Sequence, residues 1–285
     1  MFSLVATIDP QIVLLDTLIF GVILLLAGIL LSLSINKQEI ITRYSFEKIS
    51  TDGFTYGEMI ASTLVVLFFS VNVWLPLVWD PQSQPSELVI NEFNYALGFL
   101  LTMAIQFIVP SVILLFLLAQ RTNLLDALGL RNCQWGRISF FMITGLVAAY
   151  TSMLLMKPFG LEEWLTKTFG IIEDQAAVQA MKNAASPLRQ GLMIFAAVII
   201  APICEEILFR SFLYTATKKY TGVLFAAISS ALLFSVIHGS IKALIPLFVV
   251  GLILALAYEL SGSLWANILI HAMFNLISVI SILSI

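Results

Sequence analysis

Apolar stretches of roughly membrane-spanning length alternate with shorter polar connections along the chain. A transmembrane helix needs roughly 20 mainly apolar residues, and eight stretches approach or reach that length. The last three are separated only by the short sequences "HGS" and "SGS", which predicts helices that pack as antiparallel neighbours. The predicted spans are residues 12–35, 59–78, 95–119, 138–156, 188–204, 223–238, 241–260 and 263–285.

The composition supports the same interpretation. Of the 285 residues, 60% are hydrophobic and only 11% are charged, against about 25% charged in soluble domains. The first apolar stretch is too long for the core of a signal peptide, and no Lys or Arg precedes Lys37, so we expect this stretch to be the first span. The expected fold is therefore all-α, a polytopic transmembrane helical bundle of about eight helices in the lipid bilayer.

The polar connections predict the orientation of the bundle. With the N-terminus outside, the inner connections hold nine Lys and Arg residues and the outer connections five, so the positive-inside rule favours both termini outside. The fifth span then ends at residue 204 near the cytoplasmic side, and residues 210–222 form a basic connection after it. We expect residues 157–187 to lie as a helix on the membrane surface. No basic cluster points to nucleic acid, and the lack of a targeting signal fits a bacterial plasma membrane.

Ionisable side chains inside apolar spans are informative, because each costs at least about 2.5 kcal/mol at the bilayer centre. Asp16, Lys242 and Glu259 lie near span ends, and we expect them to reach the interface. The C-terminal third is different, since it contains both histidines of the chain. Its candidate functional residues are Glu205, Glu206, Arg210, His238, His271 and Asn275.

The spacing of the first three candidates predicts how they share a helix. Glu206 and Arg210 are four residues apart, in the order that favours an ion pair. Glu205 is turned by about 100° around the helix and is left without that partner. Pro202 lies just upstream, where we expect it to kink the helix and to open the end of the span to water.

These residue types favour hydrolysis. A carboxylate beside an imidazole can take a proton from water, and a second imidazole with an amide can donate hydrogen bonds to a developing oxyanion. Glu205, His238, His271 and Asn275 supply these groups, and the last two are four residues apart on one helical face.

Other interpretations stay open at this point. An ion pair and two hydrogen-bonded histidines can form a structural clasp between helices. Glu205, His238 and His271 can instead bind a zinc ion, although the chain has no HExxH sequence. Cys204 can pair with a histidine, but a lone cysteine on an apolar face more often packs. Buried charges also mark transporters, although no internal repeat is evident.

The ordered motifs resemble those of one family. The sequences "EEILFR", "FSVIH" and "HAMFN" are similar to the EExxxR, FxxxH and HxxxN motifs of the CPBP (Abi) family of CAAX proteases and bacteriocin-processing enzymes. The resemblance covers about residues 188–276 and implies a membrane-embedded peptidase of the Rce1 type, glutamate-type or metallo-type, acting on a membrane-associated peptide or protein. It assigns water activation to Glu205 and His238, and the oxyanion hole to His271 and Asn275.

The rest of the chain is less informative. Ser211 stands where the family often has glycine, and residues 1–137, with three predicted spans, match no motif. We therefore expect an N-terminal membrane region followed by a peptidase core at residues 138–285, with substrate choice residing in the N-terminal region. The alternative function is a non-catalytic membrane immunity factor or scaffold of the same family.

Overall fold

The computed structural model describes residues 49–51, 54–58, 60–61, 64, 92–104, 108, 111–112, 114–115, 119, 123–131, 134–160, 163–164, 167, 175–238 and 240–284. Every regular element in these ranges is a helix, which confirms the all-α fold. Within these ranges, four helices are long and apolar enough to cross a membrane. The predicted span 12–35, which includes Asp16, and most of the span 59–78 lie outside the described residues. The number of eight spans therefore stays a prediction.

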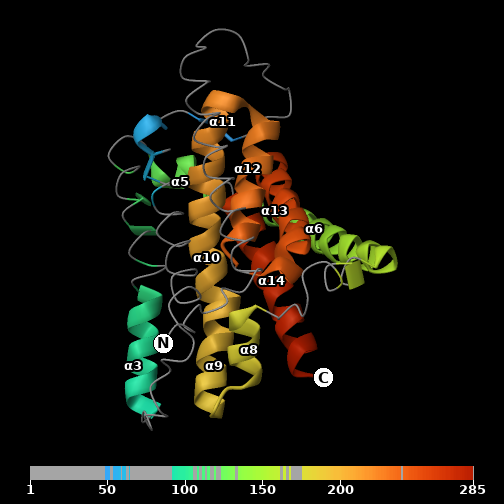
Figure 1. The fold of residues 1–285 in the computed structure, drawn as a ribbon. Helices are drawn as coiled ribbons and strands as arrows, with labels where there is room; N and C mark the ends of the chain where they lie inside the picture. Colours follow the sequence, from blue (N-terminus) through green and yellow to red (C-terminus); the bar gives the residue numbers. More distant parts are fainter. Residues whose placement is uncertain are drawn as a thin grey trace, which may run out of the picture.

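A single long helix of 35 residues, Pro187–Thr221, forms the axis of the described bundle (Figure 1). It begins where the Ser186 hydroxyl accepts a hydrogen bond from the Arg189 N–H, and it ends at Gly222, whose φ of 83° favours glycine. Along the chain it consists of α9 (Pro187–Phe195), the π-helical segment η4 (Ala196–Ile200), α10 (Ala201–Glu206), the π-helical segment η5 (Ile207–Tyr214) and α11 (Thr215–Thr221).

The long helix corrects two sequence predictions. The fifth span does not end at residue 204, and residues 210–222 are not a connection but the continuation of the same helix up to residue 221. The prediction counted Arg210 and Lys218 among the residues of a basic connection, although it also expected Arg210 to pair with Glu206 on one helix. Both side chains are instead buried beside carboxylates, so their charges do not require the helix to end.

Three further helices complete the core beside the long helix: α12 (Val223–Val236), α13 (Ile241–Ser261) and α14 (Leu264–Leu283). Helix α13 packs against both α12 and α14, as the short turns between them predict. At the closest approach of α12 and α13, a Cβ on Gly251 would lie only 2.9 Å from the Cα of Ala231. Glycine at this position therefore lets the two backbones approach closely.

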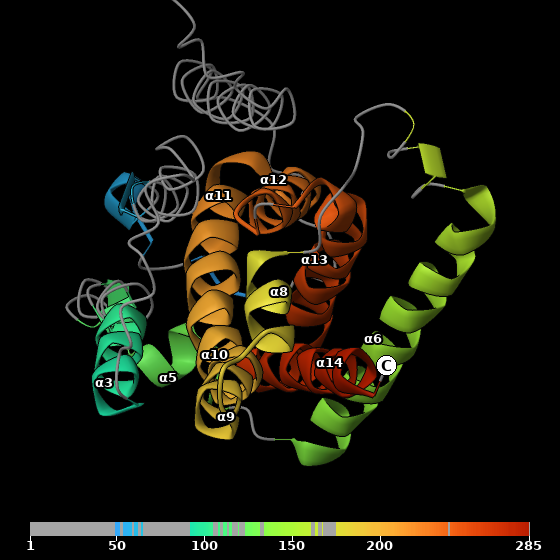
Figure 2. The same cartoon turned by 60° about the horizontal axis from the view of Figure 1, so that its bottom comes forward.

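The remaining helices lie around this core. Helix α6 (Trp135–Met156) packs against α13 and α14. It also exposes large apolar side chains, as expected for a lipid-facing helix: Trp135, Phe140, Ile143, Val147, Leu154 and Leu155. Figure 2 shows the short helix α8 (Ala176–Lys182) drawn across the space between the long helix and α13. Helix α3 (Glu92–Met103) runs beside α9, and the other short elements are α5 (Leu124–Ala127) and the 3-10 turn η3 (Lys157–Phe159).

The expectation that Glu259 reaches the interface is wrong. Its side chain is fully buried and lies 2.9 Å from the Nζ of Lys218, and we call these two residues the distal pair. The Tyr214 hydroxyl and the Ile49 N–H also donate to the Glu259 carboxylate, at 2.7 and 3.3 Å, and the Ile49 carbonyl accepts from Lys218 at 2.9 Å. The sequence gives no sign of this cluster because its members are far apart along the chain.

Described residues of the N-terminal part share the core of the bundle. Ile49, Phe54, Leu114 and Leu128 are buried in the same hydrophobic cluster as side chains of the long helix and of α12 to α14. The Phe54 ring packs edge-on against Phe212, with centroids 5.9 Å apart. The division into regions 1–137 and 138–285 stays a prediction, and the described parts of both regions pack together.

Candidate active site

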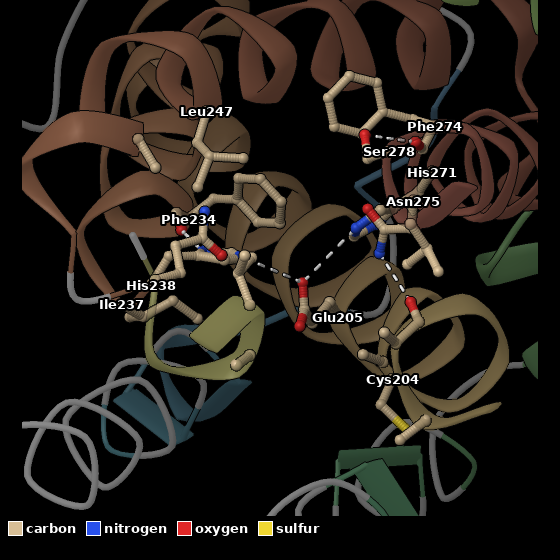
Figure 3. A pocket seen from close by; sticks show the side chains of 18 of the residues that line it. Cys204, Glu205, Phe234, Ile237, His238, Leu247, His271, Phe274, Asn275 and Ser278 are labelled. Carbon is tan, nitrogen blue, oxygen red and sulfur yellow. Dashed lines mark hydrogen bonds and ion pairs between the residues drawn. The ribbon is translucent and has the colours of Figure 1, made fainter. Parts of the chain in front are cut away.

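Four of the six candidate residues, Glu205, His238, His271 and Asn275, line one cavity of about 600 Å³ (Figure 3). Its walls come from the long helix, α3, α6, α8, the end of α12, α13 and α14. Most of the lining is apolar, including Met153, Met181 and Met193. The ionisable lining groups other than the thiol of Cys204 are Glu205, His238 and His271. Three separate helices thus bring the predicted acid and both imidazoles together.

Glu205 lies between the two imidazoles. Its Oε2 atom is 4.0 Å from Nε2 of His238 and 3.9 Å from Nε2 of His271. This oxygen is buried and has no hydrogen-bond partner in the described part of the chain. Both distances exceed the 2.7–3.2 Å of a direct hydrogen bond, and polar groups more than about 3.5 Å apart interact through a bridging water rather than directly. The carboxylate is therefore placed to bind a water molecule together with either histidine.

The Nδ1 atom of each histidine makes a hydrogen bond to an acceptor other than Glu205. The Nδ1 of His238 lies 2.6 Å from the Phe234 carbonyl oxygen, which can only accept, so this nitrogen carries the hydrogen. The Nδ1 of His271 lies 2.9 Å from Oε1 of Glu206. In the neutral state each ring therefore presents an unprotonated Nε2 toward Glu205.

Glu206 and Arg210 form the predicted ion pair, which we call the motif pair. The Nη1 of Arg210 lies 3.0 Å from Oε1 of Glu206, and both side chains are fully buried. Arg210 also donates to the Gly251 carbonyl at 3.3 Å, and its guanidinium lies 4.6 Å from the centroid of the Phe234 ring. The pair is thus anchored to α12 and α13 while its carboxylate holds His271.

Asn267 belongs to the same cluster, and the sequence prediction missed it. Its Nδ2 donates to Oε2 of Glu206 at 3.2 Å and to the Leu254 carbonyl at 2.7 Å, and its side chain is fully buried. A signal was present, because Asn267 precedes His271 by four residues on an apolar helix. A buried asparagine needs hydrogen-bond partners, and here Glu206 is one of them.

Asn275 lines the cavity, and its side-chain amide is hydrogen-bonded to the backbone of the long helix. Its Nδ2 donates to the Ala197 carbonyl at 2.7 Å. The helix continues through Pro202, and the predicted opening to water is not seen, since Pro202 and Cys204 are buried and the Glu205 side chain is only 12% exposed. The proline is accommodated by the π-helical segment η4 that precedes it.

The distances between side chains indicate whether the candidate residues could together bind a metal ion. Histidines held at Nδ1 resemble metal ligands in that respect. However, no group of three or more His, Cys, Asp or Glu side chains within the described ranges is close enough to hold a metal ion. The zinc alternative therefore lacks a ligand set among the described residues. In the described part of the chain the two imidazole rings contact Glu205, Glu206 and Phe234, and none of these contacts supports pairing with Cys204.

Comparisons with known proteins find matches to this part of the chain. A family model described as Type II CAAX prenyl endopeptidase Rce1-like covers residues 187–277, which include all six predicted residues. A Bacillus subtilis (strain 168) protein named "Putative membrane peptidase YdiL" is 27% identical over 218 residues, which are 76% of this chain and 85% of that protein. An "Uncharacterized protein" of Mycoplasma capricolum subsp. capricolum is 35% identical over 97 residues, 33% of this chain and 28% of that protein. No solved structure matches the chain significantly. The first two matches confirm the family resemblance that the motifs indicated.

Proposed function

We propose, from the Rce1-like match of residues 187–277, that this multi-pass membrane peptidase cleaves a peptide bond of a membrane-associated substrate with water held by Glu205. The observation that carries the proposal is the unpartnered Oε2 of Glu205, which lies about 4 Å from two imidazole nitrogens on the wall of a largely apolar cavity. An apolar cavity favours a substrate with apolar side chains beside the scissile bond. Glu205 and His238 are the residues that activate the water.

The reaction starts with a water molecule between Glu205 and His238. The water oxygen attacks the carbonyl carbon of the substrate, and its proton passes to the Glu205–His238 pair. A new C–O bond forms, and the carbonyl oxygen becomes an oxyanion. When the C–N bond breaks, the same proton passes to the leaving nitrogen. The pair is then restored for the next cycle, so no proton is gained or lost.

The oxyanion is stabilised by His271 and Asn275. The Nδ1–H of His271 is committed to Glu206, so this ring can donate from Nε2 only as an imidazolium. With Glu205 and Glu206 ionised and Arg210 and His271 cationic, the charges of these four side chains sum to zero, which suits a buried site. The role of Glu206 in this proposal is to hold the imidazolium in place.

The proposal can be tested with Glu205→Gln, which keeps the size of the side chain but removes its basicity. Purified protein in liposomes is incubated with a library of fluorogenic apolar peptides, and we expect turnover to fall by at least about a hundredfold, because the attacking water loses its base. Asp126→Asn, at an exposed residue that is not part of the cavity lining, is the control and should retain full activity. Wild-type turnover in Glu205→Gln would refute the proposal.

The non-catalytic alternative predicts a different result in cells. A stably expressed Glu205→Gln/His238→Ala variant that still confers the full phenotype of the wild-type gene would favour an immunity factor or scaffold. Loss of the phenotype at equal protein level supports the peptidase.

A further inference from the structure

Pro202 lies three residues before Glu205, where the long helix changes its hydrogen-bond spacing. The Ala201 N–H donates to the Ala196 carbonyl, five residues back as in a π-helix. With this spacing, the next donor along the chain would be the N–H of residue 202, and its acceptor would be the Ala197 carbonyl. Proline has no N–H, so residue 202 provides no donor for this carbonyl.

Asn275 takes the place of the missing donor. Its Nδ2 donates to the Ala197 carbonyl at 2.7 Å, although the two residues are 78 positions apart. A carbonyl oxygen can only accept, so this contact fixes which end of the amide faces η4. In membrane helices, carbonyls freed by proline are commonly satisfied by side chains of neighbouring helices. The proline of the long helix and the asparagine of α14 thus form one arrangement.

The same contact directs the rest of the Asn275 side chain. An amide nitrogen carries two hydrogens, and one of them is committed to Ala197. Asn275 lines the cavity together with Glu205 and His271 (Figure 3). The second hydrogen is the one that can serve a ligand there.

We propose that Pro202 is a positioning residue for the oxyanion hole. By withholding a backbone donor, it leaves the Ala197 carbonyl as the anchor for Asn275, and the anchored amide then directs its second N–H at the reacting carbonyl oxygen. The inference rests on the proposed function, which gives Asn275 its role in the reaction. It also explains why a proline, which normally disrupts a helix interior, lies within one helical turn of the proposed base.

The test is Pro202→Ala, which restores an N–H that competes with Asn275 for the Ala197 carbonyl. We expect kcat on a fluorogenic apolar peptide to fall by roughly ten- to a hundredfold, with KM within twofold, because an oxyanion donor serves only the transition state. In an Asn275→Ala background, Pro202→Ala should not lower kcat further, since it acts through the missing amide. A merely structural role would lower yield or melting temperature equally in both backgrounds.

Pro187→Ala is the matched control. Pro187 lies in the first turn of the same long helix, where a missing N–H is tolerated, and it is not among the described residues that line the cavity. We expect this variant to keep kcat within twofold. Wild-type kcat in Pro202→Ala, or an equal loss in the presence and absence of Asn275, would overturn the inference.

A second variant covers the case in which Pro202→Ala does not fold. Replacing Val198 by its α-hydroxy acid turns the Ala197 carbonyl into an ester carbonyl, which is a weaker acceptor. The same kcat loss is expected, again only when Asn275 is present, and unchanged kcat would overturn the inference. Glu205→Gln is measured in parallel. If that variant is inactive while Pro202→Ala is normal, only this inference fails; if Glu205→Gln is active, the proposed function fails and this inference falls with it.

Discussion

The long helix carries two buried cations, Arg210 and Lys218, and their carboxylate partners have different surroundings. In the motif pair, the Glu206 carboxylate also holds His271, whose other nitrogen faces the cavity. In the distal pair, the Glu259 carboxylate is held by a tyrosine hydroxyl and a backbone N–H, and it does not line the cavity.

The two pairs show that burial of an ion pair does not by itself indicate a functional site. Both pairs are removed from solvent, so either would be costly to break. Burial and charge alone therefore do not identify a site. The motif pair is distinguished by an imidazole that lies between its carboxylate and that of Glu205, whose Oε2 has no hydrogen-bond partner among the described residues.

The largest difference in turnover is expected when both charges of a pair are replaced by neutral side chains of similar size. Glu206→Gln/Arg210→Met should lower turnover by about a hundredfold or more, because a neutral amide cannot stabilise the His271 imidazolium as a buried carboxylate does. Lys218→Met/Glu259→Gln should keep turnover within about threefold, since the distal pair does not reach the cavity. Peptide turnover in liposomes is the measurement, and an equal loss in the two variants would contradict the comparison.

Removing only one partner of an ion pair should instead lower the stability of the protein, in the motif pair and in the distal pair alike. Arg210→Ala leaves Glu206 buried without its counter-charge, and we expect a loss of about 3–5 kcal/mol in the free energy of unfolding. Lys218→Ala should cost a similar amount for the same reason. Unfolding in mild detergent measures both variants. A normal yield and melting temperature for Arg210→Ala would show that the motif pair does not hold the fold together.

Removing one neutral hydrogen-bond donor from each carboxylate is a gentler form of the same test. Asn267→Leu removes the donor to Glu206 and Tyr214→Phe removes a donor to Glu259, and each should cost about 1–3 kcal/mol of stability. Only Asn267→Leu should also lower kcat, because only Glu206 holds a histidine of the proposed mechanism. Steady-state kinetics at matched protein stability would show whether Tyr214→Phe lowers kcat as well, which would contradict the assignment.

The smallest effect is expected at an exposed ion pair. Arg131 lies 3.1 Å from Asp126, and the two side chains are 63% and 51% exposed. Arg131→Ala should change the free energy of unfolding by less than about 1 kcal/mol, because exposed pairs are screened by water. The same unfolding measurement provides the baseline for the buried pairs, and a loss comparable to that of Arg210→Ala would show that burial does not set the contribution of an ion pair in this protein.

Much of the site was predictable because it depends on local spacing. The i,i+4 relation of Glu206 and Arg210 gives their ion pair, and it leaves Glu205 on another side of the helix. The two histidines were conspicuous because apolar spans tolerate few ionisable groups. Asn267 carried the same kind of signal, four residues before His271, but an isolated asparagine in an apolar helix did not by itself indicate a partner.

The sequence by itself determined the helical class, the apolar faces and the set of residues able to do chemistry, because these follow from composition and from the 3.6-residue repeat. Only the tertiary structure decided that the long helix continues past Arg210, that Glu259 is buried with Lys218, and that Asn275 is anchored to a carbonyl beside Pro202. The physical reason is the distance between partners along the chain. The charge of Lys218 is neutralised by a carboxylate 41 positions away, and the Ala197 carbonyl is satisfied by an amide 78 positions away, and no local pattern records those partners.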